Sequence, residues 1–290
     1  MHAVIREVCD EIKKNGESYY LISEEKRREM VKRSVSAITD IYQNSILKDS
    51  SRNSFMIKRM EDLADRTIWA MGEQLKCGDF VPFVFEHKFN MEVGDGDRKQ
   101  LMSGTIDRVD ICENDTDVYV RIIDYKTGKK DFNIVKTYYG IDIQLMVYME
   151  AAMKLVAKMR PGKNVLPAGV FYYNISDPIV SATNESAEEI EDKIKGELRL
   201  KGMVNSDKDI AEKMDNTEGT SLNIPVSRKA DGGFDSRRSK VMNTEQFNML
   251  GRFVDVRAID TADRIAGGDI RRSPYKDGQF SSCDRCPYGA

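Results

Sequence analysis

Two carboxylates and one amine on neighbouring extended segments are the residues best suited to do chemistry in this sequence. Asp107 lies in the segment 103–110, and Asp124 and Lys126 lie in the segment 120–128. Both segments are β-branched and apolar apart from their charges, which predicts two buried strands. Burying charges side by side is costly unless they pair or bind a cation. A divalent metal ion held by the two carboxylates would explain the pattern.

The residues between these segments indicate how the strands pair. Residues 114–117 read Asn-Asp-Thr-Asp, which is typical of a turn and predicts an antiparallel hairpin. Because side chains alternate along a strand, Asp124 and Lys126 should share one face, and Asp110 should face away from Asp107. The alternative is a simple salt bridge between Asp124 and Lys126 on an edge strand, since D-x-K is a short and common pattern.

These side chains suit the metal-dependent hydrolysis of a phosphodiester. The anionic phosphate repels hydroxide, and a hard cation held by carboxylates screens that charge, positions a water and lowers its pKa. Asp107 and Asp124 would be the acidic ligands of Mg²⁺, for which Mn²⁺ can substitute. Lys126 would orient or deprotonate the attacking water, or stabilise negative charge on the phosphoryl oxygens.

Two flanking segments carry further polar residues that could reach this site. Glu86 lies in the strand-like segment 81–89, where it either assists the metal or forms a hydrogen bond within the core. That segment leads to a Gly-Asp-Gly-Asp turn at 94–97, which lacks the ligand spacing of a calcium loop. Gln144 and Tyr148 lie four positions apart on a predicted helix and therefore share one face. They would either hydrogen-bond phosphate oxygens or bases, or be ordinary surface residues.

The patterns around these residues resemble the RecB-type nucleases of the PD-(D/E)XK superfamily. These patterns are G-x-I-D-R-x-D, I-I-D-Y-K-T-G and Q-L-x-x-Y. Further segments are similar to the C-terminal nuclease domains of the AddB subunits of bacterial AddAB-type ATP-dependent helicase–nucleases, namely residues 166–178, 198–203 and 283–288. The resemblance covers essentially the whole chain.

The resemblance implies a role for each matched residue. Asp107 and Asp124 would bind the metal together with the backbone carbonyl of Tyr125, and Lys126 would be the catalytic lysine. His2 would be a further metal ligand, matching the histidine of a G-x-x-x-H pattern whose glycine is absent here. Taken without the resemblance, a histidine at the chain end is normally a frayed surface residue.

The resemblance also implies a substrate and partners. Gln144 and Tyr148 would face DNA, and the activity would be that of an exonuclease on unwound single-stranded DNA. The strand cut would be the 5′-terminated one, beside an AddA-type partner subunit, in double-strand break repair by recombination. The alternative is a catalytically silent nuclease fold that binds DNA or subunits. The presence of all three candidate catalytic residues disfavours it. A phage or CRISPR-associated nuclease with the same core is a third interpretation.

The five cysteines fit a reducing compartment better than a disulfide scaffold. The resemblance implies that Cys283 and Cys286 bind a 4Fe–4S cluster in the intact protein, and such a cluster normally needs four ligands. We therefore expect this chain to be a fragment that carries no cluster. A zinc site, a redox pair or a loose thiol pair are the other interpretations of C-x-x-C. Cys9, Cys77 and Cys112 lie in apolar periodic segments, as small core residues do.

Composition narrows the class of protein further. The 290 residues are 40% hydrophobic and 32% charged, as in a globular protein with an ample core. No apolar segment approaches the about 20 residues of a membrane span, and the absence of a signal peptide predicts a cytoplasmic protein. The net charge of −3 argues against general electrostatic binding to DNA. Lysines at 126–130 nevertheless predict a local positive rim beside the site, so a partner would have to deliver the strand.

Hydrophobic periodicity predicts a mixed arrangement of helices and strands. Helices are expected over 3–14, about 23–48, about 52–76, 141–160, 185–199 and 244–267, and strands over about 81–92, 99–112, 117–126 and 167–175. Together they predict an α/β fold with a restriction-endonuclease-like core, a mixed β-sheet flanked by helices, and extra N- and C-terminal helices. We expect residues 1–290 to form a single nuclease domain. It would comprise a helical part (about 1–76), a catalytic core (about 80–175) and a C-terminal elaboration (about 180–290).

Overall fold

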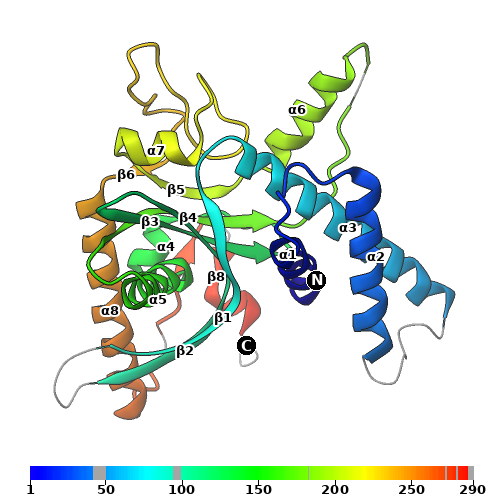
Figure 1. The fold of residues 1–290 in the computed structure, drawn as a ribbon. Helices are drawn as coiled ribbons and strands as arrows, with labels where there is room; N and C mark the ends of the chain where they lie inside the picture. The colour runs from blue at the N-terminus through cyan, green and yellow to red at the C-terminus, as the bar shows by residue number, and fades with distance from the viewer. Residues whose placement is uncertain (42–49, 94–98, 182, 272, 279, 287–290) are drawn as a thin grey trace.

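A mixed sheet of six strands lies at the centre of the part of the chain that the structure describes (Figure 1). The computed structural model describes residues 1–41, 50–93, 99–181, 183–271, 273–278 and 280–286. The strands follow the order β1-β2-β3-β4-β5-β6 across the sheet. Their bounds are β1 Val81–Val93, β2 Gln100–Glu113, β3 Asp117–Lys126, β4 Asn164–Asn174, β5 Lys201–Asn205 and β6 Val241–Met242.

The pairing of the strands places β3 in the interior of the sheet. β1 pairs with β2, and β2 with β3, in antiparallel register. β3 and β4 pair in parallel, and the chain between them contains α4 (Ile134–Tyr138) and α5 (Gln144–Met159). A parallel pair needs such a crossover because the chain must return to the same end of the sheet. β5 then pairs antiparallel with β4, and β6 parallel with β5.

Helices from both ends of the chain pack around this sheet. Figure 1 shows the N-terminal helices together on one side, and α5 and α8 on the other. The N-terminal helices are α1 (His2–Lys14), α2 (Glu24–Ile41) and α3 (Ser51–Lys76). The later elements are α6 (Ala187–Glu197), α7 (Lys208–Met214), α8 (Thr244–Ala266), β7 (Lys276–Asp277), β8 (Phe280–Ser281) and the 3-10 helix η3 (Ser282–Arg285).

Strand β3 shows how the sheet separates two cores. Ile123 and Tyr125 are buried in the core that also contains side chains of α1, α2 and α3. Val120 and Ile122 are buried in the other core, with side chains of α5 and α8. Alternate residues of a strand point to opposite faces, so a strand covered on both faces reads as a continuous apolar segment. This accounts for the apolar run that precedes Asp124.

The predicted hairpin is confirmed. The Asn114 side chain accepts hydrogen bonds from the backbone of Thr116 and Asp117, and this turn joins β2 to β3. The predicted helix over 141–160 begins only at Gln144. Short elements such as α4, α7, β5 and β6 were not predicted, because such short runs carry too little periodicity to be recognised. The Gly-Asp turn at 94–97 and the end of the helix predicted over 23–48 lie outside the described residues.

The predicted α/β class is confirmed, with a mixed sheet flanked by helices and further helices at both ends. The crossover between β3 and β4 brings the first turn of α5 back toward the end of β3, where Lys126 lies. Across the described residues, no helix combines the length and the apolar character needed to cross a membrane.

Candidate metal and nuclease site

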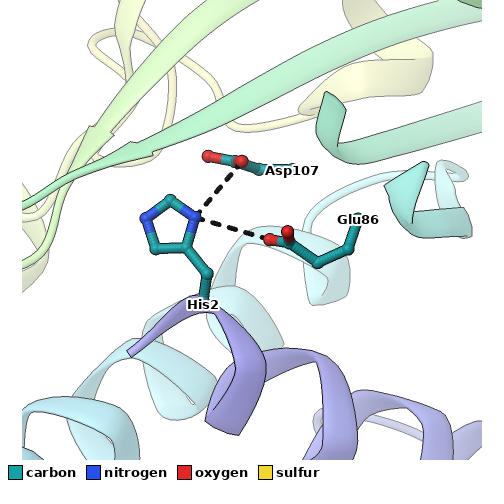
Figure 2. Close-up of side chains that lie close together, drawn as sticks. All are labelled: His2, Glu86 and Asp107. Carbon is teal, nitrogen blue, oxygen red and sulfur yellow. Dashed lines mark ion pairs between the residues drawn. The ribbon is translucent and has the colours of Figure 1, made fainter. Parts of the chain in front are cut away.

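Three metal-binding side chains from distant parts of the chain converge beside β2 (Figure 2). His2 begins α1, Glu86 lies on β1 and Asp107 lies on β2. Nδ1 of His2 lies 3.2 Å from Oδ1 of Asp107 and 3.4 Å from Oε1 of Glu86. One ligand atom from each residue lies within 4.8 Å of the other two. One imidazole and two carboxylates at this spacing can share a divalent cation.

Glu86 is held in an unusual backbone conformation. Its φ is 47°, and it is the one non-glycine residue with positive φ in the described part of the chain. A side chain in this left-handed region costs about 1–2 kcal/mol. Such strained residues cluster at functional sites, where the surrounding structure imposes them. The predicted choice between the metal and a core hydrogen bond therefore favours the site, since the Glu86 carboxylate points at His2 (Figure 2).

Asp124 and Lys126 share one face of β3, as predicted. Nζ of Lys126 lies 2.6 Å from Oδ2 of Asp124, so the ion pair of the alternative interpretation is present. The strand is not an edge strand, however, because β3 pairs with β2 on one side and β4 on the other. The backbone N–H of Tyr125 donates to Oδ2 of Asp107 at 2.7 Å. This bond connects the strand of one candidate ligand to the carboxylate of another.

The electrostatics of the site favour a cation. Asp124 is 1% exposed, and its Oδ2 has no hydrogen-bond partner of regular geometry among the described residues. Burial, and then the nearby Asp107, raise the pKa of Asp124 to about 6. Burial followed by Asp107 also raises the pKa of Glu86. A hydrogen bond to Asp107 is the largest cause that raises the pKa of His2. Carboxylates crowded in this way are stabilised by a bound divalent cation, so these residues fit a metal.

Gln144 and Tyr148 join the site through Lys126. Nζ of Lys126 donates to Oε1 of Gln144 at 3.0 Å, and Nε2 of Gln144 donates to the Tyr148 hydroxyl at 2.8 Å. The Tyr148 ring contacts Phe89 edge to face, with centroids 5.8 Å apart. Both helix residues are half-buried and point toward β3, which differs from the ordinary surface interpretation.

A second group, which was not predicted, supports the lysine. The Tyr172 hydroxyl donates to Oδ1 of Asp142 at 2.6 Å, and Nζ of Lys130 lies 3.0 Å from the same oxygen. The Tyr172 ring lies 5.5 Å from Nζ of Lys126 and 4.6 Å from Nζ of Lys130. Tyr172 is opposite Asp124 in the β3–β4 register. No local pattern marks this tyrosine, because its role depends on which strand pairs with β3.

Asp110 belongs to a separate buried cluster. Its carboxylate accepts two hydrogen bonds from Arg108 at 2.7 Å and one from Arg121 at 2.8 Å. All three side chains are at most 1% exposed. Two guanidiniums around one carboxylate leave a net positive charge inside the protein, behind β2 and β3. As predicted, Asp110 does not join the group around Asp107.

The cysteines lie away from this site. Cys9 and Cys112 are buried, as expected for core residues, and Cys77 is half-buried. Cys283 and Cys286 are both exposed at the C-terminal 3-10 helix, where the backbone N–H of Cys286 donates to the carbonyl of Cys283.

The fold and the site define the class of protein, and the comparison with known families agrees. The chain belongs to the PD-(D/E)XK nuclease superfamily, whose family model matches residues 1–290. The mixed sheet is consistent with the restriction-endonuclease-like core of that superfamily.

Its relatives carry a more specific name. Proteins from Clostridium botulinum strain Hall and Caldanaerobacter subterraneus are each 34% identical over 301 residues, and one from Clostridium acetobutylicum is 34% identical over 300 residues. Each is named as one subunit of an ATP-dependent helicase/deoxyribonuclease, the kind of complex in which AddB occurs. The alignments cover 100% of this chain and 26% of each relative, so the chain spans about a quarter of their length. The predicted resemblance to AddB nuclease domains is confirmed.

Proposed function

We propose that this chain is a divalent-metal-dependent deoxyribonuclease domain that hydrolyses phosphodiester bonds of unwound single-stranded DNA. The observation that carries the proposal is the convergence of His2, Glu86 and Asp107 next to the Asp124–Lys126 pair. These five residues come from α1, β1, β2 and β3, and the fold pairs or packs those elements against one another.

The proposed ligands of Mg²⁺ or Mn²⁺ are His2, Asp107, Asp124 and the backbone carbonyl of Tyr125, with Glu86 as an accessory ligand. A bound divalent ion would screen the phosphate charge and lower the pKa of the attacking water. Asp107 keeps its place through the bond from the Tyr125 backbone, which leaves its Oδ1 directed at His2.

Lys126 is the proposed catalytic lysine. Its ammonium group lies between the Asp124 carboxylate and the Gln144 amide oxygen, so both partners restrict its position. An ammonium group held in this way can orient the attacking water or stabilise negative charge on phosphoryl oxygens. Gln144 and Tyr148 are the proposed contacts to the DNA backbone or bases beside it.

The names of the relatives support a wider proposal for the intact protein. They are helicase/deoxyribonuclease subunits, which supports DNA as the substrate and an AddA-type helicase–nuclease subunit as the partner. We propose exonuclease action on the 5′-terminated strand during double-strand break repair, in the cytoplasm. We also propose that residues 1–290 form one nuclease domain, and that Cys283 and Cys286 ligate a 4Fe–4S cluster only in the intact protein.

The proposal is tested by cleavage of single-stranded DNA in Mg²⁺ or Mn²⁺. Asp124→Ala and Lys126→Ala should each reduce the cleavage rate by about a hundredfold or more while the fold is retained. The exposed Lys158, at the far end of α5, provides a matched control, since Lys158→Ala should cut like the parent. If the purified parent and both site variants cut equally, the site is wrong. If the folded parent never cuts, the silent DNA-binding module is the better description.

A further inference from the structure

Two tyrosines on the crossover between β3 and β4 remain exposed next to the proposed catalytic site. Tyr138 ends α4 and Tyr139 follows it, and their side chains are 56% and 52% exposed. Aromatic rings bury large apolar areas when a fold can cover them, so two adjacent exposed rings are unusual. Neither tyrosine takes part in the metal or lysine contacts described above.

The rings are fixed by aromatic neighbours. The Tyr138 ring stacks on Phe253 of α8 with centroids 5.2 Å apart and an interplanar angle of 4°. The Tyr139 ring lies 5.1 Å from the Tyr275 ring and 5.2 Å from the Tyr138 ring, the latter edge to face. Figure 1 shows α4 on the same side of the sheet as α8. A ring held in place on one side and open on the other can stack on another flat group with little further loss of side-chain entropy.

The charge around the tyrosines suits a polyanion. The segment 126–141 carries lysines at 126, 129, 130 and 136 but only one acidic residue, Asp131, although the whole chain has a net charge of −3. The exposed Lys129 lies between the proposed catalytic lysine and α4. The Arg257 guanidinium lies 5.9 Å from the Phe253 ring centroid, under the aromatic stack. Basic side chains interleaved with aromatic rings are the usual surface for single-stranded nucleic acid.

The tyrosines are also within reach of the same strand. Tyr139 precedes Gln144 by five residues, and a chain spans at most about 3.6 Å per residue, so the two lie within roughly 18 Å. Gln144 is hydrogen-bonded to Lys126. A strand bound at Lys126 would need only a few nucleotides to arrive at Tyr139.

From these observations we infer that Tyr138 and Tyr139 form a base-stacking platform for single-stranded DNA adjoining the catalytic site. The rings stack on bases a few nucleotides from the cut, and Lys129 and Lys136 face the phosphates of the same stretch. Stacking does not depend on base identity, because every base has a flat face, so this platform would hold a strand of any sequence. The inference rests on the proposed function, since it assigns a subsite to that substrate.

Binding to two labelled oligonucleotides of equal length tests the platform. One is oligo(dT) and the other has the same backbone with abasic sites, and binding is measured by fluorescence anisotropy at low salt in EDTA, which prevents cleavage. The variants are a Tyr138→Ala/Tyr139→Ala double variant and a Tyr138→Phe/Tyr139→Phe double variant. Tyr20→Ala is the matched control, because Tyr20 is 48% exposed and lies beside the N-terminal helices.

The parent should bind oligo(dT) about tenfold more tightly than the abasic oligonucleotide. The alanine double variant should lose this preference and keep the affinity for the abasic strand, whereas the phenylalanine double variant and Tyr20→Ala should retain it. A parent without base preference, or an alanine variant that keeps it, overturns the platform and favours a protein partner on this surface. Cleavage in Mg²⁺ is recorded in parallel. A parent that prefers bases but does not cut contradicts the proposed nuclease and not the platform.

Discussion

The backbone N–H of Tyr125 donates a hydrogen bond to Oδ2 of Asp107 over 2.7 Å. This single bond joins a candidate metal ligand on β2 to the strand that carries Asp124 and Lys126. It also leaves Oδ1 of Asp107 as the oxygen that faces His2, at 3.2 Å. The spacing of the two acidic ligands is therefore set by the register of a β-ladder, which is among the most rigid relationships in a protein.

His2→Ala should weaken binding of Mn²⁺ by at least about tenfold, because losing even a group that supports a metal ligand has effects of this size. The measurement is isothermal titration with Mn²⁺. His87 is the other histidine of the chain and lies on β1 outside the ligand group, so His87→Ala is the matched control. Equal affinities for the parent and His2→Ala would remove His2 from the site.

Glu86→Ala and Glu86→Gly should separate the two properties of this residue. Both variants lose the carboxylate and should bind Mn²⁺ more weakly than the parent. The glycine variant should be more stable than the alanine variant by about 1 kcal/mol, because only glycine adopts φ of 47° without strain. Urea unfolding measures the difference. An alanine variant as stable as the glycine variant would argue against a strained backbone at this position.

Asp110→Asn should destabilise the protein by about 3–5 kcal/mol, since it leaves two buried guanidiniums without their shared counter-charge. Arg108 and Arg121 both donate to this carboxylate at 2.7–2.8 Å. The free energy of unfolding in urea checks the value. Asp115 is exposed in the β2–β3 turn, and Asp115→Asn should change stability by less than about 0.5 kcal/mol. A mild effect at Asp110 would mean that water reaches the cluster.

Stability should fall as the pH rises from about 4 to 7 because of Asp255 on α8. Burial, and then the nearby Glu150 of α5, raise the pKa of Asp255 from 3.8 to about 7. Glu150 itself pairs with Lys154 at 2.5 Å, and Arg252 lines the same cavity between the two helices. In this pH window the folded protein holds a proton that the unfolded chain releases, so stability is present at low pH and lost as the pH increases.

Asp255→Asn should flatten this pH dependence. The effect should be on the order of 1 kcal/mol or less, because the half-buried carboxyl is partly screened by solvent. Thermal unfolding at pH 5 and pH 8 provides the comparison, with the exposed Asp260→Asn on the same helix as the control. Parallel stability curves for the parent and Asp255→Asn would show that the carboxyl is not the cause.

Much of the fold was predictable because its signals are local. The two strands that carry Asp107, Asp124 and Lys126 follow from apolar residues, and their pairing follows from the Asn114 turn. The long helices α1, α3 and α8 were predicted within a few residues of their observed ends. The short elements after β4 were not, since a helix of seven residues such as α7 has fewer than two turns in which to show a period.

The sequence by itself determined which chemistry this protein can do, through the kinds of residues on two neighbouring strands and their positions along the chain. Only the tertiary structure decided that His2 and Glu86 join Asp107, that Tyr172 lies beneath Lys126, and that Tyr138 stacks on Phe253. The physical reason is that turns and strand faces depend on residues a few positions apart. Contacts between distant residues depend instead on how complete helices and strands pack on a shared core.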